Sequence, residues 1–374
     1  MKHSDSILKL LPPLEAIKTI SLKQNDVLIT VAGFEARHLA AAKCLTKKAN
    51  GEAIILTYKP YDGRNDFDEL ACELRLKGIR VREVNIVKYD RFKPNFFTEN
   101  LKRNLIRLRG RRVVLDVSAM SKLAILLCLD VCRELNLPVT VHYAEAVSYG
   151  PPREAYEKAK AERSINRPSI QIYTGVQGVL RVPRFSSVAM QGQPTAAIAF
   201  MSFNEELIQA LLNSVYPSRL FLINGKPPQL KWREEATAWI HESLLKEWLD
   251  VDNPIIDGLP ARTASTLDYR ESVAVLRNLY WNLAIDHRVL LAPTGSKMQT
   301  ISCFLIAALH PDVHIEYPTP EGFLDLYSEG VGNQWIVNFG PLETYILELK
   351  KLEKSERLDV PQIVETIPKS LSAP

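Results

Sequence analysis

Hydrophobic positions in this chain form short, mostly continuous runs, separated by stretches with the spacing of amphipathic helices. The runs in the first 150 residues are VLITV, AIILTY, VREVNIV, VVLDV and PVTVHYA. A strand with one face in solvent alternates apolar and polar positions, so continuous runs predict strands buried on both faces. Helices between such strands cover both sides of a mostly parallel sheet. The pattern therefore predicts an α/β fold.

The same order of segments returns in the second half of the chain. TAAIAF corresponds to VLITVA, LFLIN to AIILT, VLLAP to VVLDV, and VHIEYP to TVHYAE. Matches in one order indicate an internal duplication. We predict two tandem Rossmann-like modules, at 1–150 and 194–340, each a mostly parallel sheet with helices on both faces, arranged as a pseudo-dimer. The third strand of the second module is assigned to the segment around Ile255 and Ile256.

The segments outside the two modules have a more polar pattern. Residues 151–193 predict a charged helix followed by a hairpin and linker, and GNQWIVNFG, at 332–340, predicts a further strand. Residues 341–374 predict a C-terminal helix, with Glu and Lys at i,i+4 spacing, and a tail.

Composition narrows the class of protein. Hydrophobic residues make up 46% and charged residues 24%, which is ordinary globular usage, and the net charge is only +4. No apolar run is long enough to span a bilayer, and the first residues lack a signal-peptide pattern. The five cysteines show no CxxC spacing and no nearby histidines. We therefore expect a cytoplasmic protein without a membrane partner, metal or cofactor.

Right-handed crossovers place the turns after parallel strands along one edge of each sheet, where ligands bind in this class of fold. The turns DVSAMSK (116–122) and APTGSKM (292–298) each put hydroxyls and a lysine where a helix begins. Backbone N–H groups at a helix start favour phosphate. The predicted ligand contacts here are Ser118, Met120, Ser121, Lys122, Thr294, Gly295, Ser296 and Lys297. The alternative is that Ser118 and Thr294 only cap helices.

The turns after the first strand of each module add further predicted contacts, namely Gly33, Phe34, Glu35, Arg37, Ser202, Phe203 and Asn204. Phe34 and Phe203 align, and each ring is either a base-stacking platform or a lid over the core. Glu35 and Asn204 align and suit a base edge or a ribose hydroxyl. Neither a dinucleotide fingerprint nor P-loop spacing is present, so an NAD site and an ATPase site are disfavoured.

The sequence leaves two further hypotheses about function open. An enzyme, a metal-independent nucleotide or phosphodiester hydrolase, would use Asp116, Ser118 and Lys122, because Asp116 ends an apolar strand beside the other two. A scaffold would contact DNA or a partner chain through the basic run Lys102, Arg103, Arg107, Arg109, Arg111 and Arg112. No aromatic residues interleave that run, which favours a solvated helix face instead.

The turn Pro293–Met298, PTGSKM, resembles the ligand turn of CARF domains, the Rossmann-like sensor domains of prokaryotic antiviral systems. Gly33, Phe34 and Glu35 lie where the first-strand ligand loop of that family lies. The resemblance implies a regulatory subunit that binds a nucleotide second messenger, typically a cyclic oligonucleotide, with Lys122 and Lys297 facing one cavity and the effector on a separate chain. The first module departs from it, with Ser-Ala-Met-Ser in place of Thr-Gly, and this asymmetry suits either a non-symmetric ligand or a site that has become a scaffold. We therefore favour a sensor over an enzyme or a scaffold.

Overall fold

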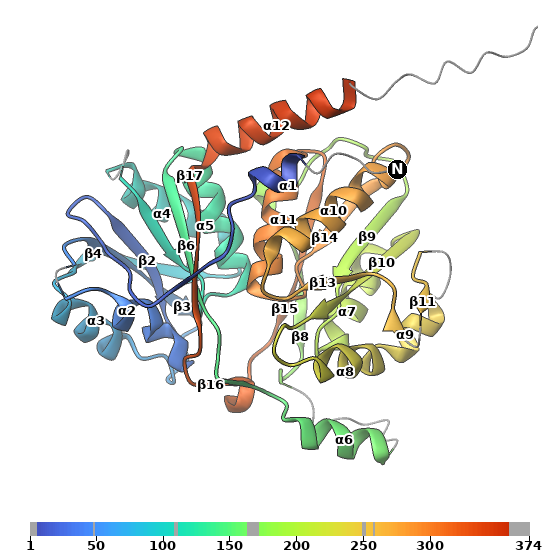
Figure 1. The fold of residues 1–374 in the computed structure, drawn as a ribbon, viewed down its shortest axis with the longest axis horizontal. Helices are drawn as coiled ribbons and strands as arrows, with labels where there is room; N and C mark the ends of the chain where they lie inside the picture. The colour runs from blue at the N-terminus through green and yellow to red at the C-terminus, as the bar shows by residue number, and fades with distance from the viewer. Residues whose placement is uncertain are drawn as a thin grey trace, which may run out of the picture.

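The computed structural model describes residues 6–47, 49–107, 111–162, 172–248, 252–256 and 259–358. It confirms the α/β fold: two sheets dominated by parallel strands lie side by side, with helices on their faces (Figure 1). Within the described residues, no helix has both the length and the apolar character needed to cross a bilayer.

The first sheet is built mainly from the N-terminal part of the chain. Its strands are β1 (Glu15–Ile17), β2 (Val27–Ala32), β3 (Glu52–Lys59), β4 (Arg80–Asp90), β5 (Val113–Asp116), β6 (Pro138–Ala144) and β17 (Gln334–Pro341), in the order β1-β17-β6-β5-β2-β3-β4. Its helices are α2 (Ala40–Cys44), α3 (Phe67–Leu76), α4 (Pro94–Ile106) and α5 (Lys122–Glu134), with the 3₁₀ turn η1 (Ala36–Leu39) after β2.

The second sheet follows the same plan. Its strands are β8 (Val176–Arg181), β9 (Thr195–Phe200), β10 (Arg219–Lys226), β13 (Thr263–Ser265), β14 (Arg288–Ala292) and β15 (His314–Pro320), in the order β13-β10-β9-β14-β15-β8. Its helices are α7 (Glu205–Val215), α8 (Trp232–Ile240), α9 (Glu242–Glu247), α10 (Tyr269–Leu283) and α11 (Lys297–Leu309). Read from β17 and from β8 respectively, the two sheets have matching strand orders, with one antiparallel pairing followed by four parallel pairings. The first sheet has β1 in addition, antiparallel to β17 at its edge.

Smaller elements connect and cap the modules. They are α1 (Ser6–Leu10), β7 (Ser148–Tyr149), α6 (Arg153–Ala161), η3 (Pro183–Phe185), β11 (Ile255–Ile256), β12 (Leu259–Pro260), η4 (Asp325–Tyr327), β16 (Ser328–Glu329) and α12 (Leu342–Leu358). The predicted charged helix and C-terminal helix therefore both exist, as α6 and α12.

Three strands lie elsewhere than the sequence boundaries place them. Ile255 and Ile256 pair antiparallel with β12, and the third strand of the second module is β13 instead, which pairs parallel with β10. A three-residue strand has too few positions for a periodic signal. The strand β17 falls largely within 194–340 but pairs with β6 of the first sheet, whereas β8, in the expected linker, completes the second sheet. Each module is thus finished by a strand from outside its own predicted range.

The core is continuous between the modules. Helices α5 and α11 pack against each other, and nearly every residue in both is buried. This explains why the two helices are apolar almost all round, since one face covers the sheet and the other meets the partner helix. The pairing also fixes the N-termini of α5 and α11 near each other, which positions the site described next.

Candidate functional site between the two modules

A cavity of about 670 Å³ lies at the carboxyl ends of the parallel strands, lined by residues of both modules. Most of the predicted ligand contacts line it, namely Gly33, Phe34, Glu35, Arg37, Met120, Ser121, Lys122, Ser202, Phe203, Gly295, Ser296 and Lys297. Ser118, Asn204 and Thr294 do not. The four predicted turns therefore meet at one cavity, as the crossover rule for parallel sheets requires.

Two lysines reach this cavity from the first residues of α5 and α11. Lys122 Nζ donates a hydrogen bond to the Thr294 carbonyl oxygen of the other module, 2.9 Å away. Lys297 Nζ lies 4.0 Å from Glu35 Oε1, again across the modules. Burial, together with repulsion from Lys297, lowers the pKa of Lys122 to about 7. Burial lowers the pKa of Lys297 to about 8, and the Glu35 charge limits the shift.

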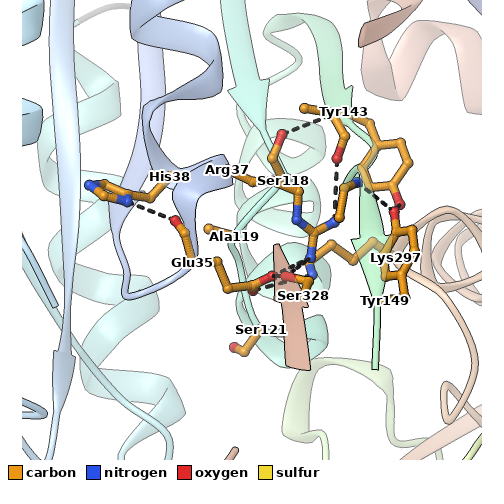
Figure 2. A network of polar contacts seen from close by, with 12 residues as sticks. Glu35, Arg37, His38, Ser118, Ala119, Ser121, Tyr143, Tyr149, Lys297 and Ser328 are labelled. Carbon is orange, nitrogen blue, oxygen red and sulfur yellow. Dashed lines mark hydrogen bonds and ion pairs between the residues drawn. The ribbon is translucent and has the colours of Figure 1, made fainter. Parts of the chain in front are cut away.

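Glu35 is the centre of a buried polar network at the turn after β2 (Figure 2). Its carboxylate forms an ion pair with Arg37 and accepts a hydrogen bond from Ser328 Oγ at 2.5 Å. Arg37 also donates to the Ala144 carbonyl oxygen at 3.3 Å. Burial alone would raise the pKa of Glu35, but the positive charges of Arg37 and Lys297 and the Ser328 bond hold it below its ordinary value. The carboxylate is therefore charged at neutral pH.

An arginine guanidinium lies over the ring of each predicted phenylalanine. The Arg64 guanidinium lies 4.5 Å from the centre of the Phe34 ring, and that of Arg233 lies 4.0 Å from the centre of the Phe203 ring. The two pairs have the same sequence separation, as the predicted duplication would require. Because a guanidinium already lies over each ring, that face is not open to a base. Sequence reasoning missed both arginines, although the equal separation was a usable signal.

These arginines also tie the modules together. Arg64 forms ion pairs with Asp62 and Asp325 and donates to the Phe323 carbonyl oxygen at 3.2 Å. Arg233 donates to three successive carbonyl oxygens, at 3.1 Å, 2.8 Å and 3.3 Å, in the segment 149–151. Each arginine thus holds the segment that follows the last parallel strand of the opposite module.

Aromatic hydroxyls make up much of the remaining wall. The lining tyrosines are Tyr58, Tyr61, Tyr89, Tyr143, Tyr149, Tyr173, Tyr317 and Tyr327. Tyr58 Oη donates to the Ala119 carbonyl oxygen at 3.3 Å and accepts from the Ser121 N–H at 2.7 Å, which fixes the turn before α5. Burial raises the pKa of Tyr327 to about 12, so its hydroxyl stays neutral. The wall thus offers flat apolar faces with neutral hydrogen-bonding edges.

Asp116 and Ser118 lie in the protein interior and do not line the cavity. Asp116 Oδ1 accepts from Ser118 Oγ at 2.5 Å and contacts His142 Nδ1 at 2.9 Å, and Thr30 Oγ1 donates to Oδ2 at 3.1 Å. Burial would raise the pKa of Asp116, but His142 and Ser118 outweigh it and keep the pKa below its ordinary value. Ser118 Oγ also accepts from the Ala144 N–H. These bonds engage Asp116 and Ser118, two of the three residues that the enzyme hypothesis requires, whereas the third, Lys122, lines the cavity.

The other predicted hydroxyls and amide have structural partners. The helix N-caps are Ser121 and Ser296, not Ser118 and Thr294. Thr294 Oγ1 donates to the Phe200 carbonyl oxygen at 2.5 Å, and Asn204 Oδ1 accepts from the Glu206 N–H at 3.1 Å as the N-cap of α7. The capping alternative is thus wrong for Ser118 and Thr294, and the serines two or three residues later cap the helices instead.

The basic run is largely engaged within the molecule. Lys102 pairs with Glu134, Arg111 lies 3.7 Å from Glu52, and Arg112 pairs with Asp26. Arg107 donates to Asn85 Oδ1 at 2.9 Å, Arg103 is exposed, and Arg109 lies outside the described residues. This arrangement favours the solvated-face interpretation over a continuous strip of phosphate contacts.

No protein-family model and no curated protein matches the chain. Among solved structures, the chain is similar to the crystal structure of the cytoplasmic domain of a prokaryotic cation chloride cotransporter, at 8% identity and a TM-score of 0.22, over 82% of this chain and 99% of that one. At this TM-score the similarity carries no information about function.

Proposed function

We propose that the cavity binds a nucleotide-type ligand and that the chain is a ligand-sensing regulatory subunit. The observation that carries the proposal is the meeting of two helix N-termini, each beginning with a lysine, in one cavity whose walls are rich in tyrosine and phenylalanine. Helix N-termini and lysines stabilise phosphate, and aromatic faces stack on bases. The volume lies within the range of about 300–1,000 Å³ that small-molecule sites occupy.

The buried positions of Asp116 and Ser118 support binding over hydrolysis. A nucleophile or general base must come within hydrogen-bond reach of the reacting atoms, and both groups are bonded below the cavity. The cross-module bonds of Arg64 and Arg233 support a sensor, since a ligand held between two modules biases their relative position. The resemblance to CARF domains points the same way and suggests an antiviral defence system, with the effector on a partner chain.

The test is a thermal-shift series with the full chain against mononucleotides, linear dinucleotides and cyclic oligonucleotides. A ligand that binds the folded state alone stabilises it by about 2.7 kcal/mol at a hundredfold excess over its Kd. We expect at least one nucleotide to raise the melting temperature and Lys122→Met to reduce the rise. The control Arg103→Ala, on the exposed face of α4, should leave it unchanged.

Two outcomes would overturn the proposal. Stabilisation by none of the nucleotides, in a sample that melts cooperatively, would favour a scaffold without a small ligand. A nucleotide that binds and is then converted to product, as chromatography of the mixture would reveal, would identify an enzyme instead of a sensor.

A further inference from the structure

The two lysines at the cavity floor are matched by the duplication but differ in their surroundings. Lys297 faces Glu35, whose Oε1 lies 4.0 Å from its Nζ. The residue of the second module that corresponds to Glu35 is Asn204, which carries no charge and is engaged in capping α7. Among the described residues, Lys122 has the Thr294 carbonyl oxygen as its hydrogen-bond partner and no carboxylate within ion-pair distance. Lys297 therefore lies near a carboxylate, one that also pairs with Arg37, whereas Lys122 has no carboxylate within ion-pair distance among the described residues.

The matched arginines differ in the same way. Arg64 pairs with the carboxylates of Asp62 and Asp325, whereas Arg233 donates to carbonyl oxygens and lies over the Phe203 ring. Burial lowers the pKa of Arg233 to about 10, so its guanidinium still carries its charge at neutral pH. A further lining arginine, Arg91, follows β4 and also donates to carbonyl oxygens, whereas the cavity-lining residues just after β13 are Thr266 and Leu267.

An anion discriminates strongly between these two surroundings. A phosphate that leaves water needs a cation whose charge is not already compensated, and a nearby carboxylate repels it. Lys122 has N–H groups left over after its single bond to Thr294. Glu35 Oε1, in contrast, is separated from Lys297 by more than a hydrogen-bond length, so it can accept a bond from a ligand N–H or O–H.

We propose that the cavity floor holds one phosphate group, at Lys122, and presents Glu35 to a hydrogen-bond donor such as an exocyclic amine or a ribose hydroxyl. The inference rests on the proposed function and narrows its ligand. The ligand is then an asymmetric nucleotide, with its phosphate and its donor group on opposite halves of the cavity. A two-fold symmetric cyclic dinucleotide would instead place one of its two phosphates against Glu35.

The first experiment uses inorganic phosphate, AMP and cyclic di-AMP as probes in low-salt titration calorimetry of the full chain. We expect one phosphate per chain, tighter binding of AMP than of phosphate, and weaker binding of cyclic di-AMP than of AMP. Lys122→Met should weaken phosphate at least tenfold, and the matched Lys297→Met at most threefold. Two phosphates per chain, an equal loss in both variants, or no binding at 10 mM phosphate would overturn the inference.

A second variant tests the carboxylate directly. Glu35→Gln keeps the shape of the side chain and removes its charge, so we expect cyclic di-AMP to bind at least tenfold more tightly than to the wild type. An unchanged affinity, with a normal melting curve, would contradict the inference. If Glu35→Gln fails to fold, the two lysine variants still test whether the phosphate binds at Lys122.

The outcomes distinguish a failure of this inference from a failure of the proposed function on which it rests. Nucleotides that bind while Lys122→Met and Lys297→Met lose affinity equally would leave the sensor proposal standing and overturn the single phosphate position. If phosphate bound at Lys122 and no nucleotide bound more tightly than phosphate, the sensor proposal would be overturned and the single phosphate position would stand.

Discussion

The two modules have the same strand order, but the side chains beneath their cavity-facing turns are of different kinds. In the first module Asp116, at the end of β5, bonds Thr30 of the neighbouring β2. The register of the second sheet puts Ala292 beside Ala199 at the equivalent place. A buried polar network on one side thus corresponds to a pair of methyl groups on the other.

This difference shows what a duplicated fold has to conserve. The backbone pairings and the α5–α11 contact recur because each module must cover its sheet. The polar network is not needed for that purpose, so it can exist in one module alone. The asymmetry continues at the cavity, where Glu35 has Asn204 as its counterpart and, among the described residues, only Lys297 of the two lysines lies within ion-pair distance of a carboxylate. The first module is therefore the more polar half of the site.

The largest expected effect comes from Asp116→Ala. The substitution leaves His142, Thr30 and Ser118 without their buried partner, and breaking such a pair costs about 3–5 kcal/mol of unfolding free energy. Because the folded pKa of Asp116 is below its ordinary value, this stabilisation is present at neutral pH and is lost as the pH falls below about 4. Urea denaturation at pH 7 and at low pH measures both effects.

The control for that experiment is Thr30→Ala, which introduces the residue found at the equivalent place in the second module. It removes one hydrogen bond, so a loss of about 1 kcal/mol is expected. If Asp116→Ala cost no more than Thr30→Ala, the two modules would be equally stable without the network and the comparison would fail.

The matched arginines give the next effect in size. Arg233→Met removes a charged donor from three carbonyl oxygens and should cost about 2–3 kcal/mol of unfolding free energy. Arg64→Met breaks ion pairs with the solvent-accessible Asp62 and Asp325, which are worth about 0–1 kcal/mol. Chemical denaturation of the two variants side by side tests this order. A reversed order would indicate that Arg64 is the stronger tie between the modules.

The pH dependence of anion binding sharpens the contrast between the lysines. Sulfate keeps its charge across the neutral range, so a change in its affinity reports on the protein. With a pKa of about 7, Lys122 is largely charged below pH 7 and loses its proton above it. Its neighbour Lys297 has a pKa of about 8, and Cys303, whose thiol has a pKa raised by burial, stays neutral.

We therefore expect the sulfate affinity to fall roughly tenfold between pH 7 and pH 8.5, as titration calorimetry would measure. The decrease should disappear in Lys122→Met and persist, with a changed midpoint, in Lys297→Met. A pH-independent affinity in the wild type would show that Lys122 does not carry the bound anion.

The smallest effect concerns the two N-caps. Ser296 takes part in a reciprocal capping box with Gln299 and donates to the Thr266 carbonyl oxygen at 2.7 Å. Ser121 caps α5 by accepting from the Ala124 N–H at 3.2 Å. Ser296→Ala should therefore cost about 1–2 kcal/mol and Ser121→Ala about 0.5–1 kcal/mol, measured by urea denaturation. Equal losses would mean that the capping box adds nothing.

Much of the fold and part of the site could be predicted from local pattern. Continuous apolar runs located the buried strands, and the helix-start chemistry of the two lysine turns located the first residues of α5 and α11. The rule that strand ends share one edge then brought Phe34, Phe203 and both lysines to the same cavity. These inferences succeeded because strand burial and helix starts depend on a few neighbouring residues.

The tertiary structure alone decided which distant segments complete each module. Three contacts join segments separated by more than half the chain. They are the pairing of β17 with the first sheet, the hydrogen bond from Ser328 to Glu35, and the contact between Gln334 and His142. No local pattern encodes such pairings, because they depend on how the two modules pack. For the same reason, Lys122 and Lys297 look equivalent in the sequence, and the packing of Glu35 against Lys297 makes their surroundings unequal.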